Sequence, residues 1–285
     1  MGARHRERGP GPPGHPGRAR HGRVHQPMST EPRQPGEAAA EGAEVEDPVT
    51  LRVFRYQPDE HDEPYYETFE VPRTEGMTVL DALIHARDRF DGTLTFRHSC
   101  RQGVCGSDAM FVNGRQRLCC TTQVADLAEP IQIDPLPHQG VLKDLVVDMD
   151  HFYEQMRAVE PFFDPDELPS GDLEEQRQSP ANRERIKLDT RCIWCGACMS
   201  SCNIAAGDNQ YLGPAALTKA HRFVFDEREG EARREERLEM MADDHAVWRC
   251  QTQFSCTEVC PKDIPITENI QDLKRETAKR DLSLW

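Results

Sequence analysis

The sequence lacks two features that would place it in common classes of protein, a long apolar run and a surplus of basic residues. None of its 285 residues belongs to an apolar run of the roughly eighteen or more residues that span a bilayer, so we expect a soluble chain that reaches a membrane only through a partner. Lysine is scarce, with six residues against 29 arginines and 50 acidic residues, and the formal net charge is −15. This acidic excess argues against a partner nucleic acid, which needs a basic face. It favours a halophilic protein, whose self-repulsion is screened by salt, over an ordinary acidic cytosolic protein.

Large apolar residues are nearly absent from residues 1–46, which are rich in Pro, Gly, Ala and charged residues. Such a segment cannot bury a core, and we expect it to be disordered. Residues 1–27 hold six Arg and one Glu, without the apolar segment of a secretory signal. The composition changes at Met28, so we expect the protein to start there and residues 1–27 to be an extension of the gene model.

No export signal accompanies the eleven cysteines, which stand at positions 100, 105, 119, 120, 192, 195, 198, 202, 250, 256 and 260. Spacings of two and three residues dominate. Such spacing without an export signal indicates metal binding rather than a disulfide framework. The glycine fingerprint of dinucleotide-binding folds is also absent, so the chain should not bind a flavin itself.

Residues 47–143 have the pattern of a β-grasp domain, the fold of plant-type ferredoxins. The predicted elements are strands over 48–56, 65–71, 94–100 and 130–136 and a helix over 77–90. The pair Thr78 and Asp81 forms a capping box at the start of the helix. A hairpin should turn at Asn113-Gly114, a sequence that suits a type I′ turn.

Residues 144–285 lose the strand pattern and should be all-α, which gives the whole chain an α+β fold. The predicted helices cover 144–159, the segment from Pro180 towards Cys192, 214–229 and 266–282, with an acidic loop over 162–178. Ser179-Pro180 and Gly213-Pro214 are typical helix starts. The charged run 226–240 should form a solvated helical face. The arrangement resembles a two-cluster bacterial ferredoxin.

Two cysteine runs in this second domain have the spacing of bacterial ferredoxins. The first has C-x2-C-x2-C-x3-C spacing, and the second would have the same spacing if Gln253 were cysteine. In such proteins the fourth cysteine of each run binds the other cluster. We therefore predict a [4Fe–4S] cluster at Cys192, Cys195, Cys198 and Cys260 and a [3Fe–4S] cluster at Cys202, Cys250 and Cys256. The alternative, a pair of zinc ribbons, needs two sets of four ligands and is one ligand short.

An earlier motif begins like a plant-type [2Fe–2S] loop. Cys100 and Cys105 have C-x4-C spacing, but the third position holds Asp108 where cysteine is usual. Because a free aspartate is ionised at neutral pH, Asp108 is a candidate iron ligand. The alternative is an aspartate that only stabilises a turn.

The whole set of motifs resembles the iron–sulfur subunit of succinate dehydrogenase and of its relative fumarate reductase. The resemblance covers residues 48–285 and rests on "SCRQGVCGSDAM", "KDLVVDM", "CIWCGACMSSC", "GPAALTKAHRF" and "CTEVCPKDI". It implies a [2Fe–2S] cluster held by Cys100, Cys105, Asp108 and Cys120. Cys119 is the alternative ligand. We expect it to be a buried apolar residue instead, because neighbours on a strand point to opposite faces.

The resemblance also implies a role. A separate flavoprotein with covalent FAD would oxidise succinate, and electrons would pass through [2Fe–2S], [4Fe–4S] and [3Fe–4S] to a membrane quinone in the tricarboxylic acid cycle and respiratory chain. This chain would hold no catalytic residue and would lie on the cytoplasmic face of the cell membrane, held by small membrane-anchor subunits. At the usual quinone contacts the chain has Asn203 and Gln251, with no Trp in 203–212. This difference favours another quinone site, such as one for menaquinone.

Other functions share the same clusters. A free ferredoxin would purify alone, whereas the predicted subunit should purify with a flavoprotein. The chain could also serve a fumarate reductase or another flavoprotein oxidoreductase, such as a thiol-linked fumarate reductase or a glycolate oxidase. The last two often carry further cysteine-rich segments, and none follows Cys260.

Overall fold

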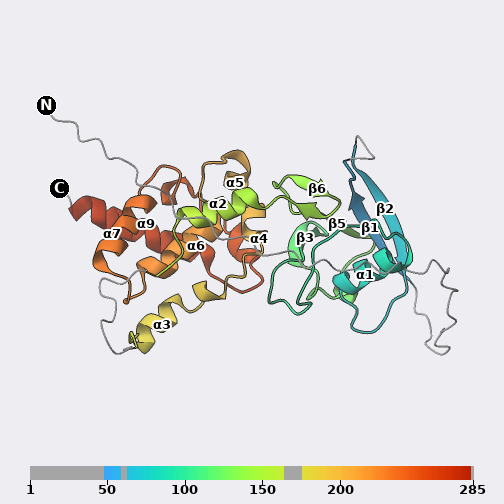
Figure 1. Ribbon diagram of the computed structural model, residues 1–285, viewed down its shortest axis with the longest axis horizontal. Helices are drawn as coiled ribbons and strands as arrows, with labels where there is room; N and C mark the ends of the chain where they lie inside the picture. The colour runs from blue at the N-terminus through green and yellow to red at the C-terminus, as the bar shows by residue number, and fades with distance from the viewer. Residues whose placement is uncertain (1–47, 59–62, 164–174, 284–285) are drawn as a thin grey trace, which may run out of the picture. The chain divides into compact units, whose positions relative to one another are not determined.

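The described chain contains a sheet followed by a group of helices (Figure 1). The computed structural model describes residues 48–58, 63–163 and 175–283. The predicted disorder of residues 1–46 and the predicted start at Met28 lie outside these residues, as does most of the predicted acidic loop. The predicted α+β fold is confirmed.

The sheet has five strands in the order β2-β1-β5-β3-β4. They are β1 (Val49–Arg55), β2 (Tyr65–Val71), β3 (Ala109–Val112), β4 (Arg115–Leu118) and β5 (Ile131–Asp134). Strand β1 runs parallel to β5 and antiparallel to β2, as a β-grasp sheet requires. Val49, Leu51 and Val53 alternate into the core, and helix α1 (Val79–Arg89) begins with the predicted capping box of Thr78 and Asp81.

The predicted hairpin lies between β3 and β4 and brings the two ends of the cysteine loop together. Asn113 and Gly114 have φ of 45° and 78°, the positive values that a type I′ turn needs. Ala109 pairs with Leu118. The pairing therefore places Asp108, just before β3, beside the residues that follow β4.

Two predicted elements are wrong. Residues 94–100 form no strand, and the helix predicted from residue 144 begins only at Asp150, after a small hairpin of β6 (Val141–Lys143) and β7 (Val146–Val147). Asp144 explains both differences. Its fully buried carboxylate accepts hydrogen bonds from the Thr95 N–H at 2.8 Å and from Arg55 Nε at 3.1 Å. The segment after residue 143 is therefore tied to the sheet domain instead of starting a helix.

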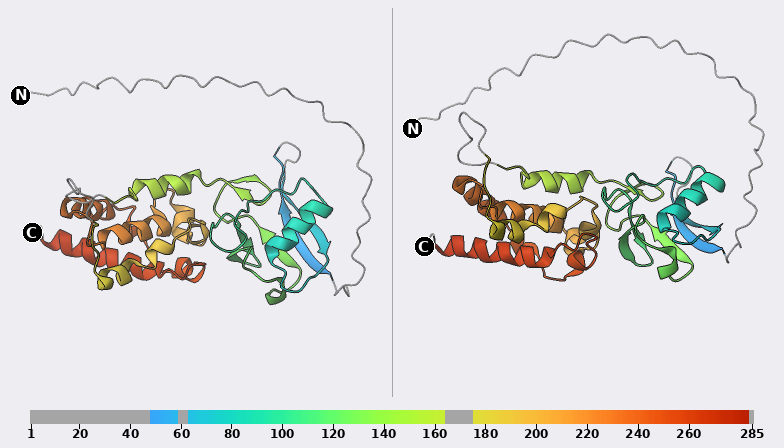
Figure 2. Two further views of the ribbon diagram at one scale, coloured as in Figure 1. Left: turned by 60° about the horizontal axis from the view of Figure 1, so that its bottom comes forward. Right: turned by 90° about the horizontal axis from the view of Figure 1, so that it is seen from below.

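The helical part is built around α6, which lies between α2 and α9 (Figure 2). Its helices are α2 (Asp150–Ala158), α3 (Pro180–Ile186), α4 (Ala197–Ser200), α5 (Asn203–Gly207), α6 (Gly213–Val224), α7 (Glu231–Met241), α8 (Ser255–Glu258) and α9 (Ile266–Ser283). Three short 3-10 turns, η1 (Val124–Asp126), η2 (Asp189–Arg191) and η3 (Val247–Arg249), complete the described helical elements. Ser179 caps α3 as predicted, with its hydroxyl accepting the Asn182 N–H.

The charged run 226–240 is less solvated than its composition predicts. Arg237 on α7 is fully buried. Its Nε donates to Glu229 Oε1 at 2.7 Å, and its Nη1 donates to the carbonyl oxygen of Val159 at 2.8 Å. A buried guanidinium is tolerated because charge and hydrogen bonds satisfy it together.

Candidate metal centres

All eleven cysteines lie in the described residues, and none forms a disulfide. Ten of them gather at three places, and the remaining one, Cys119, lies in the hydrophobic core. The three places are a loop before β3 and two pockets among the helices. We call them the loop site, the four-cysteine pocket and the three-cysteine pocket.

The loop site is organised by backbone N–H groups. The N–H groups of Gln102, Val104 and Cys105 point at Cys100 Sγ from 3.5, 3.3 and 3.2 Å. These hydrogen bonds, led by that of Gln102, lower the pKa of the Cys100 thiol to about 7, because they stabilise the thiolate. The Gly103 N–H reaches Cys120 Sγ at 3.2 Å. Backbone N–H groups of residues 102–105 therefore face the sulfur atoms of Cys100 and Cys120.

Asp108 is buried at the base of this loop, with 1% of its surface exposed. Its Oδ2 accepts the Cys120 N–H at 2.5 Å. Its Oδ1 is buried and has no hydrogen-bond partner among the described residues. A buried carboxylate oxygen without a partner is costly, and an iron ion would satisfy it. The donor set of three thiols and one carboxylate thus fits an iron–sulfur cluster.

Cys119 and Cys120 lie in the turn that follows β4, so the alternation of side chains along a strand does not apply to them. Strand β4 ends at Leu118, whose carbonyl oxygen accepts the Thr121 N–H at 3.2 Å. The expectation that both cysteines lie on a strand is therefore wrong. Burial nevertheless raises the pKa of the fully buried Cys119 thiol far above its usual value, while the Cys120 sulfur lies beside Gly103 in the loop site.

The four-cysteine pocket joins both cysteine runs of the helical part. It is lined by Cys192, Cys195, Cys198 and Cys260, with apolar walls from Phe152, Ala215, Ile264 and Ile266. Burial raises the pKa of the Cys195 thiol to about 12 and that of Cys198 well above its usual value. The pocket is therefore a dry, sulfur-lined space that suits a bound cluster better than free thiolates.

The three-cysteine pocket contains the remaining three cysteines of the two runs. It is lined by Cys202, Cys250 and Cys256, together with Tyr211, Gln253 and Thr267. Cys202 belongs to the first cysteine run and Cys260, in the other pocket, belongs to the second. The fourth cysteine of each run thus lines the pocket that holds the other run's cysteines. Gln253 lies in the wall where a fourth cysteine would otherwise stand.

The zinc alternative needs four ligands around each of two ions. The lining of the three-cysteine pocket holds three cysteines, Cys202, Cys250 and Cys256, and is therefore one cysteine short of such a set. Among the residues that the structure describes, no three His, Cys, Asp or Glu side chains form a group that could hold a single metal ion.

The loop site and the four-cysteine pocket approach each other at Gly106. A Cβ atom added to Gly106 would lie 2.8 Å from Cys195 Cβ and 3.0 Å from the carbonyl oxygen of Ile193. Gly106 also has φ of +73°, a value that favours glycine. Only glycine allows the two loops to meet this closely.

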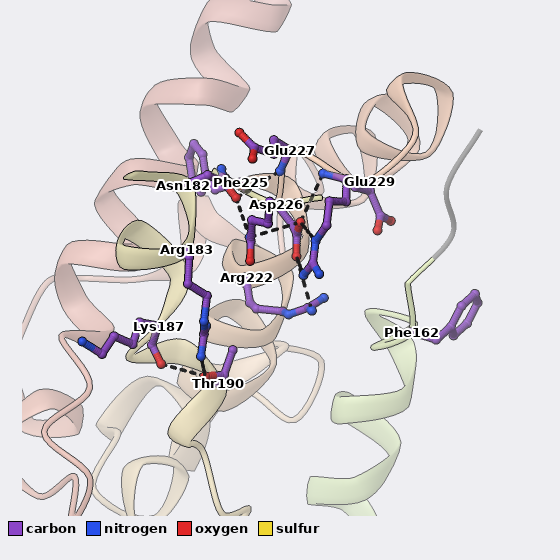
Figure 3. Close-up of polar contacts among 12 residues, drawn as sticks. Phe162, Asn182, Arg183, Lys187, Thr190, Arg222, Phe225, Asp226, Glu227 and Glu229 are labelled. Atoms are coloured by element: carbon purple, nitrogen blue, oxygen red, sulfur yellow. Dashed lines mark hydrogen bonds and ion pairs between the residues drawn. The ribbon is translucent and has the colours of Figure 1, made fainter. Parts of the chain in front are cut away.

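Polar contacts hold the segment that leads into the four-cysteine pocket. Around Asp226, Arg222 Nη2 pairs with the carboxylate at 3.3 Å, and Asn182 on α3 donates to the carbonyl oxygen of Phe225 at 2.7 Å (Figure 3). These contacts fasten α3 to the end of α6. The chain then continues through η2 to Cys192.

A second, fully buried network lies directly before Cys192. Asp189 accepts hydrogen bonds from His221 Nδ1 at 2.6 Å and from Asn269 Nδ2 at 2.7 Å. Its backbone carbonyl accepts the Cys192 N–H at 3.3 Å. The network joins η2, α6 and α9. Sequence reasoning missed it, because the three residues are far apart in the chain and no motif links them.

Comparison with known proteins gives the same two-part organisation. Residues 50–154 match the model of a 2Fe-2S iron-sulfur cluster binding domain, and residues 189–264 match that of a 4Fe-4S dicluster domain. The chain is 36% identical to the mitochondrial succinate dehydrogenase [ubiquinone] iron-sulfur subunit of Dictyostelium discoideum, over 79% of this chain and 81% of that protein. It is 34% identical to the fumarate reductase iron-sulfur subunit of Haemophilus influenzae, over 81% of this chain and 93% of that protein.

A solved structure resembles the chain over a similar length. A chain of the Mycobacterium smegmatis Sdh1 complex in the apo form superposes with a TM-score of 0.71 and 27% identity, covering 82% of this chain and 97% of that chain. The resemblance therefore extends through both the sheet and the helices.

Proposed function

This chain belongs to the family of the iron–sulfur subunits of succinate dehydrogenase and fumarate reductase, and we propose that it serves a succinate:quinone oxidoreductase. Its role is electron transfer. The observation that carries the proposal is the sorting of the cysteines into a loop site, a four-cysteine pocket and a three-cysteine pocket. The dicarboxylate site then belongs to another subunit, and this chain contributes no catalytic residue.

The ligand sets follow from the three sites. Cys100, Cys105, Asp108 and Cys120 would hold a [2Fe–2S] cluster; Cys192, Cys195, Cys198 and Cys260 a [4Fe–4S] cluster; and Cys202, Cys250 and Cys256 a [3Fe–4S] cluster. The assignment of Asp108 is supported by its buried, unpartnered Oδ1. Gln253 supports the three-iron assignment, because an amide is a poor ligand for a fourth iron. When bound, the clusters supply one-electron carriers between a flavin and a quinone.

The proposed partners are an FAD-containing flavoprotein and small membrane-anchor subunits, with the chain peripheral on the cytoplasmic face of the cell membrane. In the described part of the chain, no helix is both long and apolar enough to cross a bilayer. Gln251 lies in the wall of the three-cysteine pocket, next to Cys250. Its presence, and that of Asn203, support a menaquinone site over one with the family's usual contacts. A halophilic source is supported by the net charge of −15.

The cluster inventory can be tested on the complex purified from its natural host. Iron and sulfide analysis with electron paramagnetic resonance (EPR) should reveal three clusters, one of them a [3Fe–4S] visible when oxidised. A Gln253→Cys change should favour a fourth iron at that cluster and lower its potential. Zinc in place of iron, or an unchanged EPR spectrum in Gln253→Cys, would contradict the assignment. Purification without a flavoprotein would favour the free ferredoxin.

The reverse reaction is the second candidate, because the relative from Haemophilus influenzae is a fumarate reductase subunit. The two directions differ in which reaction is faster with the native quinone. We expect succinate oxidation to exceed quinol-dependent fumarate reduction in membranes. The opposite ratio would assign the chain to a fumarate reductase.

A further inference from the structure

The two helical pockets differ in which groups face their sulfur atoms. In the four-cysteine pocket the groups that stabilise the thiols by hydrogen bonds are backbone N–H groups, such as that of Trp194 toward Cys192. In the three-cysteine pocket two side chains with hydroxyl groups also line the space around the sulfur atoms. Thr267 Oγ1 lies 3.6 Å from Cys256 Sγ, and Tyr211 lines the same pocket as Cys250.

Once a metal is bound, the hydrogen bond between Thr267 and Cys256 can have only one donor. An iron-bound cysteine carries no proton, so Thr267 must be the donor to Cys256 Sγ. Its own oxygen then accepts the hydroxyl proton of Thr257, 2.9 Å away. Thr257 Oγ1 in turn accepts the Thr267 backbone N–H at 2.9 Å. Each proton in this small network has one acceptor, which polarises the Thr267 hydroxyl toward the sulfur.

Tyr211 reaches the same pocket from a different element. It precedes α6, and only 1% of its surface is exposed. A buried phenol needs a hydrogen-bond partner, and Cys250 lines the same pocket as the Tyr211 ring. The two side chains therefore reach the pocket from separate elements of the chain.

We propose that Thr267 and Tyr211 are positioning residues that raise the reduction potential at the three-cysteine pocket. The inference rests on the proposed function, since it requires a cluster there. A reduced cluster carries one more negative charge than an oxidised one, and part of that charge lies on the sulfur ligands. A hydroxyl donor stabilises the reduced form more, so the potential rises. A higher potential at the three-cysteine pocket would direct electrons toward it.

The test is a potentiometric EPR titration of the assembled complex. Thr267→Val and Tyr211→Phe each remove a hydroxyl at nearly constant volume. Each should lower the midpoint potential of the [3Fe–4S] cluster, and the double variant should lower it further. The potentials of the other two clusters should stay unchanged. Thr267→Ser keeps the hydroxyl and should restore the original value.

Thr277→Val is the matched control. Thr277 is a fully buried threonine on the same helix, α9, and its hydroxyl has no hydrogen-bond partner in the described structure. This change should leave all three potentials unaltered. If Thr267→Val loses the cluster, Tyr211→Phe and Thr267→Ser still decide the matter.

Unchanged potentials in both Thr267→Val and Tyr211→Phe, with the [3Fe–4S] signal intact, would overturn the inference. An equal shift in Thr267→Ser would do the same, because it would show that the hydroxyl is not responsible. A natural complex without a [3Fe–4S] signal is a different result. It would overturn the cluster assignment under the proposed function, and this inference with it.

Discussion

Cys100 in the loop site and Cys195 in the four-cysteine pocket are stabilised by opposite means, although burial also raises the pKa of Cys120, in the loop site, to about 12. In the loop site, hydrogen bonds from backbone N–H groups, led by Gln102, lower the pKa of the Cys100 thiol to about 7. In the four-cysteine pocket, burial raises the pKa of Cys195 to about 12. The loop thus stabilises a thiolate through its own backbone. The pocket stabilises a neutral thiol, whose proton a metal must displace.

The loop site and the helical pockets also differ in whether neighbouring or distant parts of the chain position their cysteines. The loop site depends on the conformation of one short segment and on the hairpin that follows it. The helical pockets depend on elements far apart in the chain, because each combines cysteines of both runs. Cys260 lies in the pocket of the first run, and Cys202 lies in the pocket of the second. Changes in the loop should therefore affect one site, whereas changes in distant helical contacts should affect the pockets without touching the loop.

The largest expected effect is at Asp108. Asp108→Ala should make the [2Fe–2S] cluster labile or leave one iron position to solvent, because it removes the carboxylate proposed as a ligand. Asp108→Cys should keep the cluster with altered g-values and potential. EPR of the reduced complex measures both, and the clusters of the helical pockets should stay intact.

Cys119→Ser is the control for Asp108. Cys119 is fully buried in the core, so the change should cost stability without altering the spectrum. If Cys119→Ser destroys the [2Fe–2S] cluster while Asp108→Ala leaves its spectrum untouched, the cluster is ligated by cysteine alone.

The local features were predictable from the sequence, and the distant ones were not. The capping box at Thr78 and the turn at Asn113-Gly114 depend on neighbouring residues, so short motifs reveal them. The cysteine groups follow from spacing because clusters impose it. The missing strand over 94–100 was not predictable, since it depends on Asp144, 49 residues beyond Thr95.

The residues around the pockets were missed for the same reason. Tyr211 and Cys250 line one pocket although they are 39 positions apart in the sequence, and Asp189 contacts Asn269 across 80 positions. No periodicity or spacing marks such pairs. Their importance appears only when the helices are packed together.

The second-largest expected effect is a loss of stability in the helical part when Asp189 is changed. Asp189→Ala would leave the buried His221 and Asn269 without their partner. Breaking a buried polar network of this kind costs about 3–5 kcal/mol. Urea unfolding of the full chain should show this loss, and EPR should show the helical clusters failing before the [2Fe–2S] cluster.

Asp281→Ala serves as the control for Asp189, because Asp281 lies half-exposed near the end of α9 and pairs with Arg280 at 3.2 Å. It should change stability by less than about 1 kcal/mol. Simultaneous loss of all three clusters in Asp189→Ala would contradict the separation of the two regions.

A smaller effect is expected at Gly106, where the two regions touch. Gly106→Ala combines an unfavourable φ, worth about 1–2 kcal/mol, with an overlap on Cys195 worth about 1–3 kcal/mol. Gly114→Ala has the same problem with φ but meets no atom within 4 Å. The difference between the two variants in urea unfolding isolates the contact. Equal destabilisation would mean that the contact between the loops contributes nothing.

The smallest effect is an acid dependence of the sheet part through Asp91. Burial raises the pKa of this carboxyl, but hydrogen bonds from Thr93 and Arg55 outweigh it and lower the pKa to about 2. A lowered folded pKa gives stability that is complete above the unfolded value of about 4 and declines as the pH falls toward 2. After allowance for solvent screening, the contribution at neutral pH is about 1 kcal/mol. Asp91→Asn should therefore weaken the sheet part at pH 7 and flatten its response between about pH 4 and pH 2.

Hydrogen exchange measured by mass spectrometry can separate the sheet from the helices in this experiment. Protection should change in the peptides of the sheet and not in those of α6 and α9. Asp226, in the helical part, responds with the same sign, because hydrogen bonds from Arg228 outweigh burial and lower its pKa. Asp226→Asn should thus flatten the acid response of α6 alone. If either variant changed hydrogen-exchange protection equally in the sheet and in the helices, the two parts would unfold as one unit. The loop site would then be independent of the helices only in its hydrogen bonds.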